Sequence, residues 1–187
     1  MRVFIAVELP EAVKKEIARI QNKIMNTPGR IRWVKPSSLH ITLKFLGEIE
    51  KEKLNRVFEV TQKIADKFKP FFFEIKGVGI FPETGSPRII WIGIEKGHLE
   101  LGRMAKELED RLFEQGFPRE RKKWTPHITL GRVKRLNNQE IIRKLINQEK
   151  QTTGGWVKAE TISLMQSHLT PQGAIYTPLE RFPLKGE

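Results

Sequence analysis

The tetrapeptide His-Ile-Thr-Leu occurs twice in this sequence, beginning once at His40 and again at His127. Sliding the chain against itself by this offset of 87 residues, without a gap, aligns residues of similar character along most of its length. For example, segment 3–8 falls on 90–95 and segment 17–19 falls on 104–106. Two copies are too few for a stacked array, which needs about three or more. The register therefore predicts a single domain over residues 1–187 with two pseudo-twofold halves.

The halves span about residues 1–87 and 88–174, and residues 175–184 form a last apolar segment that closes the sheet. Short segments rich in β-branched residues predict strands, and apolar residues three and four apart predict helices. We expect strands at 2–8, 39–46, 71–81, 88–95 and 156–168, and a further strand that begins at His127. We expect a first helix that opens at 9–11 and ends at 27–29, and further helices at 54–68, 98–115 and 138–148. Residues 30–35, 119–124 and 151–155 are expected to be links or loops.

Composition narrows the class of protein. A formal net charge of +12 and an isoelectric point of about 10.0 favour a polyanionic partner, although a lysine-rich surface can also serve solubility alone. The absence of cysteine excludes a disulfide framework, thiolate catalysis and thiolate metal ligands. We expect no signal peptide, and apolar runs such as 89–94 are far shorter than the roughly 20 residues of a membrane span. We therefore expect a cytoplasmic protein.

The repeated tetrapeptide carries chemistry if it is a strand. Residues two apart on a strand point to the same face, so His40 and Thr42 share one face, and His127 and Thr129 share another. The pseudo-twofold axis then directs two imidazoles and two hydroxyls into one cleft. Imidazole titrates near pH 6.5, so one ring can accept a proton while the other donates one. Threonine hydroxyls can donate to non-bridging phosphate oxygens. This set suits phosphodiester chemistry without a metal.

Two other interpretations of the histidines are open. A single His-x-Thr is most often a locally satisfied core or surface histidine, but two identical copies locked to a chain-wide register argue against this. A zinc site needs three or four ligands, and the repeat supplies only two histidines. His168 also begins a His-x-Thr sequence, but its counterpart 87 residues earlier is Phe81, so we expect it to lie outside the site. His98 is expected at the exposed start of a helix.

The two halves differ five residues after each histidine, where Phe45 corresponds to Arg132. An odd number of steps turns both side chains away from the cleft in a regular strand, and only a bend or bulge would turn them back. In that case Arg132 could bind phosphate bidentately and Phe45 could stack on a base. A core phenylalanine and a solvated arginine are equally compatible with the pattern.

Basic residues and a tryptophan precede each motif, at 30–33 and 119–124. This mixture suits contact with an RNA backbone and exposed bases, although a solvated loop with one packed tryptophan is the alternative. No Gly-rich triphosphate-binding loop is present.

With these residues in view, the chain resembles the two-histidine phosphoesterase superfamily, and within it the RNA 2′,3′-cyclic phosphodiesterases, also called 2′-5′ RNA ligases. The resemblance rests on segments 38–47 and 125–132, together with the opening segment 2–7 and the closing segment 176–179. It implies an α+β, bilobal, pseudo-twofold fold with antiparallel sheets flanked by helices and a cleft between the lobes.

The resemblance also implies metal-independent opening of an RNA 2′,3′-cyclic phosphate to a 2′-phosphate, with no cofactor. By the family pattern His40 is the proton donor to the 3′ oxygen and His127 is the base that activates water. Thr42 and Thr129 complete the motifs, and the family supports Phe45 and Arg132 as substrate contacts. ATP-independent 2′-5′ joining is the same chemistry in reverse, and tRNA fragments are candidate substrates for a monomeric enzyme.

Two other functions are compatible with the sequence. One is a non-catalytic RNA-binding module, in which the histidines are incidental. The other is a two-histidine phosphodiesterase that acts on a different cyclic or 2′-5′ linked nucleotide.

Overall fold

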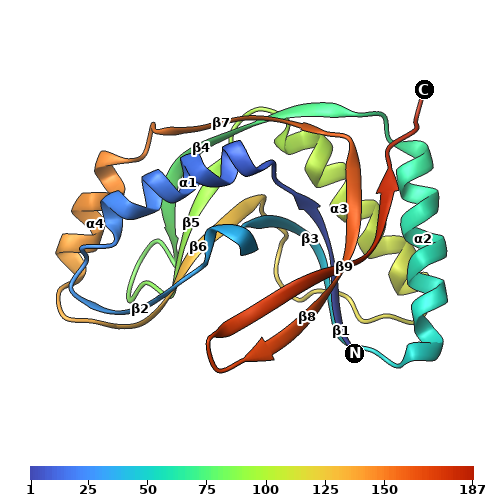
Figure 1. The fold of residues 1–187 in the computed structure, drawn as a ribbon, viewed down its shortest axis with the longest axis horizontal. Coiled ribbons are helices and arrows are strands. Elements are labelled where there is room, and N and C mark those ends of the chain that lie inside the picture. The colour runs from blue at the N-terminus through green and yellow to red at the C-terminus, as the bar shows by residue number, and fades with distance from the viewer.

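Two antiparallel sheets form the centre of the molecule (Figure 1). The structure is a computed structural model and describes every residue from Met1 to Glu187. In chain order the elements are β1 (Arg2–Glu8), α1 (Glu11–Ile24), β2 (Gly29–Trp33), β3 (His40–Glu48), α2 (Leu54–Lys67), β4 (Phe71–Phe81), β5 (Ile89–Ile94), α3 (His98–Glu114), β6 (His127–Leu136), α4 (Gln139–Gln148), β7 (Thr153–Ala159), β8 (Thr161–Thr170) and β9 (Gly173–Pro183). Sheet A has the strand order β3-β1-β8-β9, and sheet B has the order β2-β6-β5-β4-β7.

Each sheet contains strands from both halves of the chain. In sheet A, β1 of the first half pairs with β8 of the second, and β3 and β9 flank this pair, whereas in sheet B β2 and β4 of the first half join β5, β6 and β7. The offset of 87 residues relates β1 to β5, β3 to β6 and β4 to β8, so the order β3-β1-β8 repeats as β6-β5-β4. The expected pseudo-twofold α+β fold is therefore confirmed, with β4 of the first half and β8 of the second exchanged between the two sheets.

The helices cover one face of each sheet. Helices α2 and α3 pack together against sheet A, and α1 and α4 pack against sheet B, as Figure 1 shows on its right and left sides. The helical stripe expected in α1 is buried, since Ile17, Ile20 and Ile24 have no exposed surface. The apolar faces meet in one continuous core of 38 buried residues to which both halves contribute. The opposite faces of the sheets remain free to build a site.

Most expected elements are confirmed with small shifts at their ends, including the closing strand, which is β9 at the edge of sheet A. The link at 30–35 was wrong: β2 lies there and pairs with β6. Arg30 and Arg32 are exposed while Ile31 and Trp33 are half-buried, a two-residue alternation that the basic composition obscured.

The single strand expected at 156–168 was also wrong. It is two strands in different sheets, because the chain leaves β7 in sheet B and enters β8 in sheet A around Glu160. The exposed loop expected at 151–155 ends earlier than predicted, since Thr153 already belongs to β7. Gly154 is buried against Ile75, where a side chain would come within 2.7 Å of the isoleucine methyl group. None of the helices is both long enough and apolar enough to pass through a membrane.

Candidate active site

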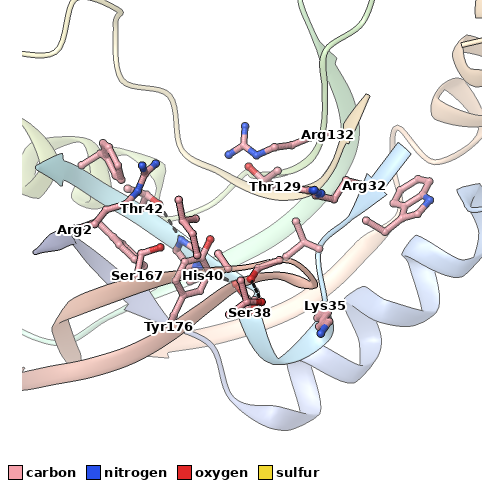
Figure 2. A pocket seen from close by; sticks show the side chains of 18 of the residues that line it. Arg2, Arg32, Lys35, Ser38, His40, Thr42, Thr129, Arg132, Ser167 and Tyr176 are labelled. Atoms are coloured by element: carbon pink, nitrogen blue, oxygen red, sulfur yellow. Dashed lines mark hydrogen bonds between the residues drawn. The ribbon is translucent and has the colours of Figure 1, made fainter. Parts of the chain in front are cut away.

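A cavity of about 540 Å³ lies where the uncovered faces of the two sheets meet (Figure 2). Strands β1, β3, β8 and β9 of sheet A and β2 and β6 of sheet B line it. Its walls include all six side chains that the sequence singled out, which are His40, Thr42, Phe45, His127, Thr129 and Arg132. In the close-up, Thr129 and Arg132 lie across the cavity from His40 and Thr42. The pseudo-twofold axis therefore brings residues far apart in sequence into one site.

Strand alternation places the motif residues as expected. Ile41 and Leu43 are buried beneath sheet A, while His40 and Thr42 are half-buried on the cavity side. The second copy on β6 follows the same alternation. The apolar members of each motif thus anchor the strand, and the polar members face the cavity.

Phe45 and Arg132 reach the cavity because each motif strand contains a β-bulge. Opposite β1, the register moves from Thr42 to Lys44 in one step, so Leu43 is an extra residue in β3. Opposite β5, the register moves from Thr129 to Gly131, so Leu130 is the extra residue in β6. An extra residue reverses the alternation, which turns the fifth residue after each histidine back to the histidine's own face. Both side chains line the cavity.

The two imidazoles are held by the same kind of hydrogen bond. Nδ1 of His40 donates to the carbonyl oxygen of Ser38 at 2.7 Å, and Nδ1 of His127 donates to the carbonyl oxygen of Thr125 at 2.8 Å. Because a carbonyl only accepts, the hydrogen on Nδ1 is fixed and Nε2 is the atom that exchanges protons. Nε2 of His40 lies 3.0 Å from the Thr42 hydroxyl. Each ring is thus oriented by the carbonyl two residues before it, and His40 also contacts the threonine of its own motif.

Burial lowers the pKa of both imidazoles, since the charged form loses hydration. The carbonyl acceptors oppose this effect, and the positive charge of Arg132 adds to it in both rings. The pKa of His40 is lowered further by the neighbouring His127 and Lys14. In the free protein both rings are therefore predominantly neutral at pH 7.

The rings around the two histidines differ. His40 lies 4.9 Å from the ring of Phe4 and 5.0 Å, edge to face, from Tyr176 of β9. His127 meets Phe81 at 5.5 Å with perpendicular planes. The site is thus symmetric in its reactive groups and asymmetric in the surfaces that support them.

Four cationic side chains line the cavity, namely Arg2, Arg32, Lys35 and Arg132. No carboxylate lines it. Arg32 of β2 is the register partner of Arg132 on β6, and both appear on the same side of Figure 2. The guanidinium of Arg2 lies 5.0 Å from the centre of the Phe45 ring. Such a field favours a phosphate.

Sequence reasoning missed Arg2, Ser167 and Tyr176 as lining residues. Only the two-residue alternation of β1 could have indicated Arg2, whereas Ser167 and Tyr176 enter through the exchange of β8 into sheet A. Arg32 lay in the first basic segment, which does line the cavity. The second basic segment does not, and its Trp124 instead donates to the carbonyl oxygen of Thr42 at 3.0 Å. His168 is exposed outside the cavity.

Comparison with known proteins agrees with this arrangement. The profile described as LigT like Phosphoesterase matches the chain twice, over residues 7–91 and again over residues 92–176. The chain belongs to the LigT-like phosphoesterase family. A relative from Archaeoglobus fulgidus, named RNA 2′,3′-cyclic phosphodiesterase, is 39% identical over 185 residues, which cover 97% of this chain and 99% of the relative. A protein of the same name from Methanothermobacter thermautotrophicus is 34% identical over 98% of this chain and 99% of its own length.

Two solved structures have the same fold. The crystal structure of TT0787 from Thermus thermophilus superposes with a TM-score of 0.85, at 32% identity and complete coverage of both chains. The LigT of E. coli, crystallised with 3′-AMP, superposes with a TM-score of 0.79 over 98% of this chain and 97% of its own, but its identity of 23% supports the fold alone.

Proposed function

We propose that this LigT-like phosphoesterase hydrolyses the 2′,3′-cyclic phosphate at the end of an RNA to a 2′-phosphate. The observation that carries the proposal is the pair of His-x-Thr faces in one cavity lined by four cations and no carboxylate. The name shared by the archaeal relatives supports the substrate class.

The proposed reaction is an in-line displacement between the two histidines. Nε2 of His127 accepts a proton from water as the water oxygen forms a bond to phosphorus. The bond from phosphorus to the 3′ oxygen breaks, and His40 in its imidazolium form, which the negative charge of a bound phosphate favours, donates its Nε2 proton to that oxygen. The carbonyl acceptors of Ser38 and Thr125 keep both Nε2 atoms directed at the substrate. The hydrogen bonds at the two rings are nearly the same, so they do not distinguish the proton donor from the proton acceptor. The roles are therefore assigned by the family pattern.

The other lining residues stabilise and orient the phosphate. The hydroxyls of Thr42 and Thr129 donate to the non-bridging oxygens, where negative charge grows in the transition state. Arg132 binds the same oxygens bidentately. Phe45 stacks on the terminal base, and the Arg2 guanidinium 5.0 Å from its ring holds the ring in place.

The test uses an oligonucleotide that ends in a 2′,3′-cyclic phosphate, incubated with the protein in EDTA. We expect a product heavier by one water that a 3′-specific phosphatase does not dephosphorylate. Unchanged substrate with and without added divalent metal would overturn the activity. Turnover that EDTA abolishes would overturn the metal-independent mechanism.

Histidine variants test the assignment of residues. His40→Ala and His127→Ala are each expected to lower kcat by a factor on the order of 10² to 10⁴ while RNA is still bound. His168→Ala is the matched control, because this histidine is exposed outside the cavity. Near-normal turnover by either motif variant would refute the shared site. In the rival RNA-binding module, the same variants would change binding alone and the wild type would show no turnover.

We also propose that an RNA 5′-hydroxyl can replace water in the same displacement: the 5′ oxygen forms a bond to phosphorus, the bond to the 3′ oxygen breaks, and a 2′-5′ linkage results without ATP. Comparing small cyclic nucleotides with tRNA fragments as substrates separates RNA-end specificity from action on another nucleotide.

A further inference from the structure

A second cavity, of about 850 Å³, borders the proposed active site on the side of His127. Its walls come from β4, β5, the C-terminal part of α4 and the segment just before β6. Thr125 and Pro126 line this second cavity, and the next residue, His127, lines the first. The two cavities are therefore neighbours on either side of one histidine.

The second cavity has an aromatic floor. Trp91 of β5 lines it and is half-buried. Its register partner on β4 is Gly79, where a side chain would collide with the six-membered ring of the indole. At Gly93 a side chain would come within 3.1 Å of the far edge of the same ring. Two glycines thus leave the space in which the indole lies over the sheet.

This indole is connected to the first cavity by one further ring. Phe81 lies 4.9 Å from Trp91 with the planes at 32°, and 5.5 Å, edge to face, from His127. A base stacked on Trp91 would therefore be separated from His127 by the single ring of Phe81. Base stacking on an aromatic side chain is tolerant of sequence, which suits an enzyme that acts on RNA ends.

The polar groups of the second cavity suit a nucleotide. Nε1 of Trp91 is the only buried side-chain nitrogen or oxygen that lacks a hydrogen-bond partner. Three cations line the walls, Lys76, Arg143 and Lys150, together with the carboxylates of Glu83 and Glu95. Lys76 is paired with Glu95 at 2.8 Å, and Arg143 donates to the carbonyl oxygens of Glu83 and Gly85. Lys150 forms no ion pair and remains available to a phosphate.

We propose that the second cavity binds a second RNA nucleotide, with its base stacked on Trp91 and its phosphate at Lys150. This inference rests on the proposed function and extends it from one nucleotide to two. The nucleotide can come from the substrate strand, next to the cyclic end. It can also come from the strand whose 5′-hydroxyl replaces water in the joining reaction, since His127 lies between the cavities.

The experiment compares kcat/KM for a 2′,3′-cyclic mononucleotide with that for a trinucleotide ending in the same group. We expect the wild type to prefer the trinucleotide, and Trp91→Leu to lower this preference about tenfold, the usual effect of losing one stacked base. Lys150→Ala, a surface change, is expected to lower it in the same direction. The ratio of the two substrates cancels a general loss of folded or active enzyme.

Matched controls remove a residue of the same kind elsewhere. Trp156→Leu removes a tryptophan that is 55% exposed on β7, and Lys63→Ala removes an exposed cation from α2. Both should retain the wild-type preference.

A second arm measures inhibition of mononucleotide hydrolysis by a 5′-hydroxyl oligonucleotide without a cyclic end. Inhibition that weakens in Trp91→Leu assigns the cavity to the attacking strand, and a loss confined to the first arm assigns it to the substrate strand.

Preferences and inhibition that are the same in the wild type and both variants would overturn the second site. If the wild type turns over neither substrate, the proposed function fails instead. The second site is then decided by titrating a fluorescent 5′-hydroxyl oligonucleotide. Weaker binding by Trp91→Leu and Lys150→Ala than by the controls supports the site, and equal binding overturns it.

Discussion

Leu43 and Leu130, which are 87 residues apart, are the extra residues in two equivalent β-bulges. Both are buried, at 2% and 0% exposure, so each bulge is anchored in the core. The carbonyl oxygen of Leu130 accepts hydrogen bonds from Gln21 Nε2 at 2.8 Å and from the Val34 amide at 2.9 Å. The repeat therefore preserves a backbone irregularity as well as a motif.

The paired bulges make the two ends of the cavity different. They aim the same sequence position of each half into the cavity, and that position is Phe45 in one half and Arg132 in the other. A symmetric pair of histidines thus acquires an apolar end suited to a base and a cationic end suited to phosphate.

Replacing Arg132 with methionine tests the cationic end. The change removes a charged donor from the substrate phosphate, and hydrogen bonds to charged groups contribute about 1.5 to 3 kcal/mol. We expect kcat/KM for the cyclic substrate to fall by roughly one to two orders of magnitude. Arg135→Met is the control, because Arg135 lies on the same strand and is exposed outside the cavity. Equal losses in both variants would assign the effect to overall charge.

The pH profile follows from the two lowered pKa values. In the free enzyme kcat/KM rises as His127 loses its proton and falls as His40 loses its own. Burial lowers the pKa of both rings, so we expect the maximum below the ordinary imidazole value of about 6.5. Arg132→Met removes a charge that lowers both pKa values, so its maximum should move to higher pH. A wild-type maximum above pH 7 would contradict this assignment.

Replacing Lys44 tests how much a buried ion pair contributes to the free energy of unfolding. Its side chain is 2% exposed, lies 2.7 Å from the carboxylate of Glu109 and donates to the carbonyl oxygen of Pro118 at 3.0 Å. Lys44→Met removes the ion-pair partner of Glu109 and the donor to this carbonyl, although the Glu120 amide still donates to the Glu109 carboxylate at 2.7 Å. Breaking a buried pair typically costs about 3 to 5 kcal/mol, and we expect the lower end because Glu109 is 20% exposed.

Urea unfolding measures this cost. Lys106→Met is the control, since Lys106 lies 2.6 Å from Asp110 but is 78% exposed, and surface pairs contribute about 1 kcal/mol or less. If Lys44→Met lowers the free energy of unfolding no more than Lys106→Met does, burial adds nothing to the stabilisation by the ion pair.

The sequence was sufficient for the halves, the motif strands and the four His-x-Thr residues of the cavity, because a repeat with a fixed offset carries three-dimensional information; for Phe45 and Arg132 the strand pattern left the direction of the side chain open. Local patterns failed where pairing is long-range. Segment 30–33 forms a strand only because β6 lies beside it, and the direction of Arg132 depends on a bulge that no residue type announces. Gln21 and Lys44 are polar residues that a pattern assigns to solvent, yet both are buried with specific partners.

The exchange of strands predicts that neither half folds alone. A fragment of residues 1–87 lacks β8, which pairs with β1, and leaves β4 without β5 and β7. A fragment of residues 88–187 lacks β1 and β4, on which its own strands pair. Unpaired edges and an open core would leave each fragment unfolded or aggregated.

Co-expression should restore the fold. We expect the two fragments to co-purify as a one-to-one complex with the circular dichroism spectrum and cyclic phosphodiesterase activity of the intact chain. The control is the full chain cut at an engineered protease site between β4 and β5, where residues 83–86 are exposed. This cut chain should remain folded, because it breaks no strand pairing. Cooperative thermal unfolding of either fragment by itself would contradict the exchange, since the core would then not require strands from both halves.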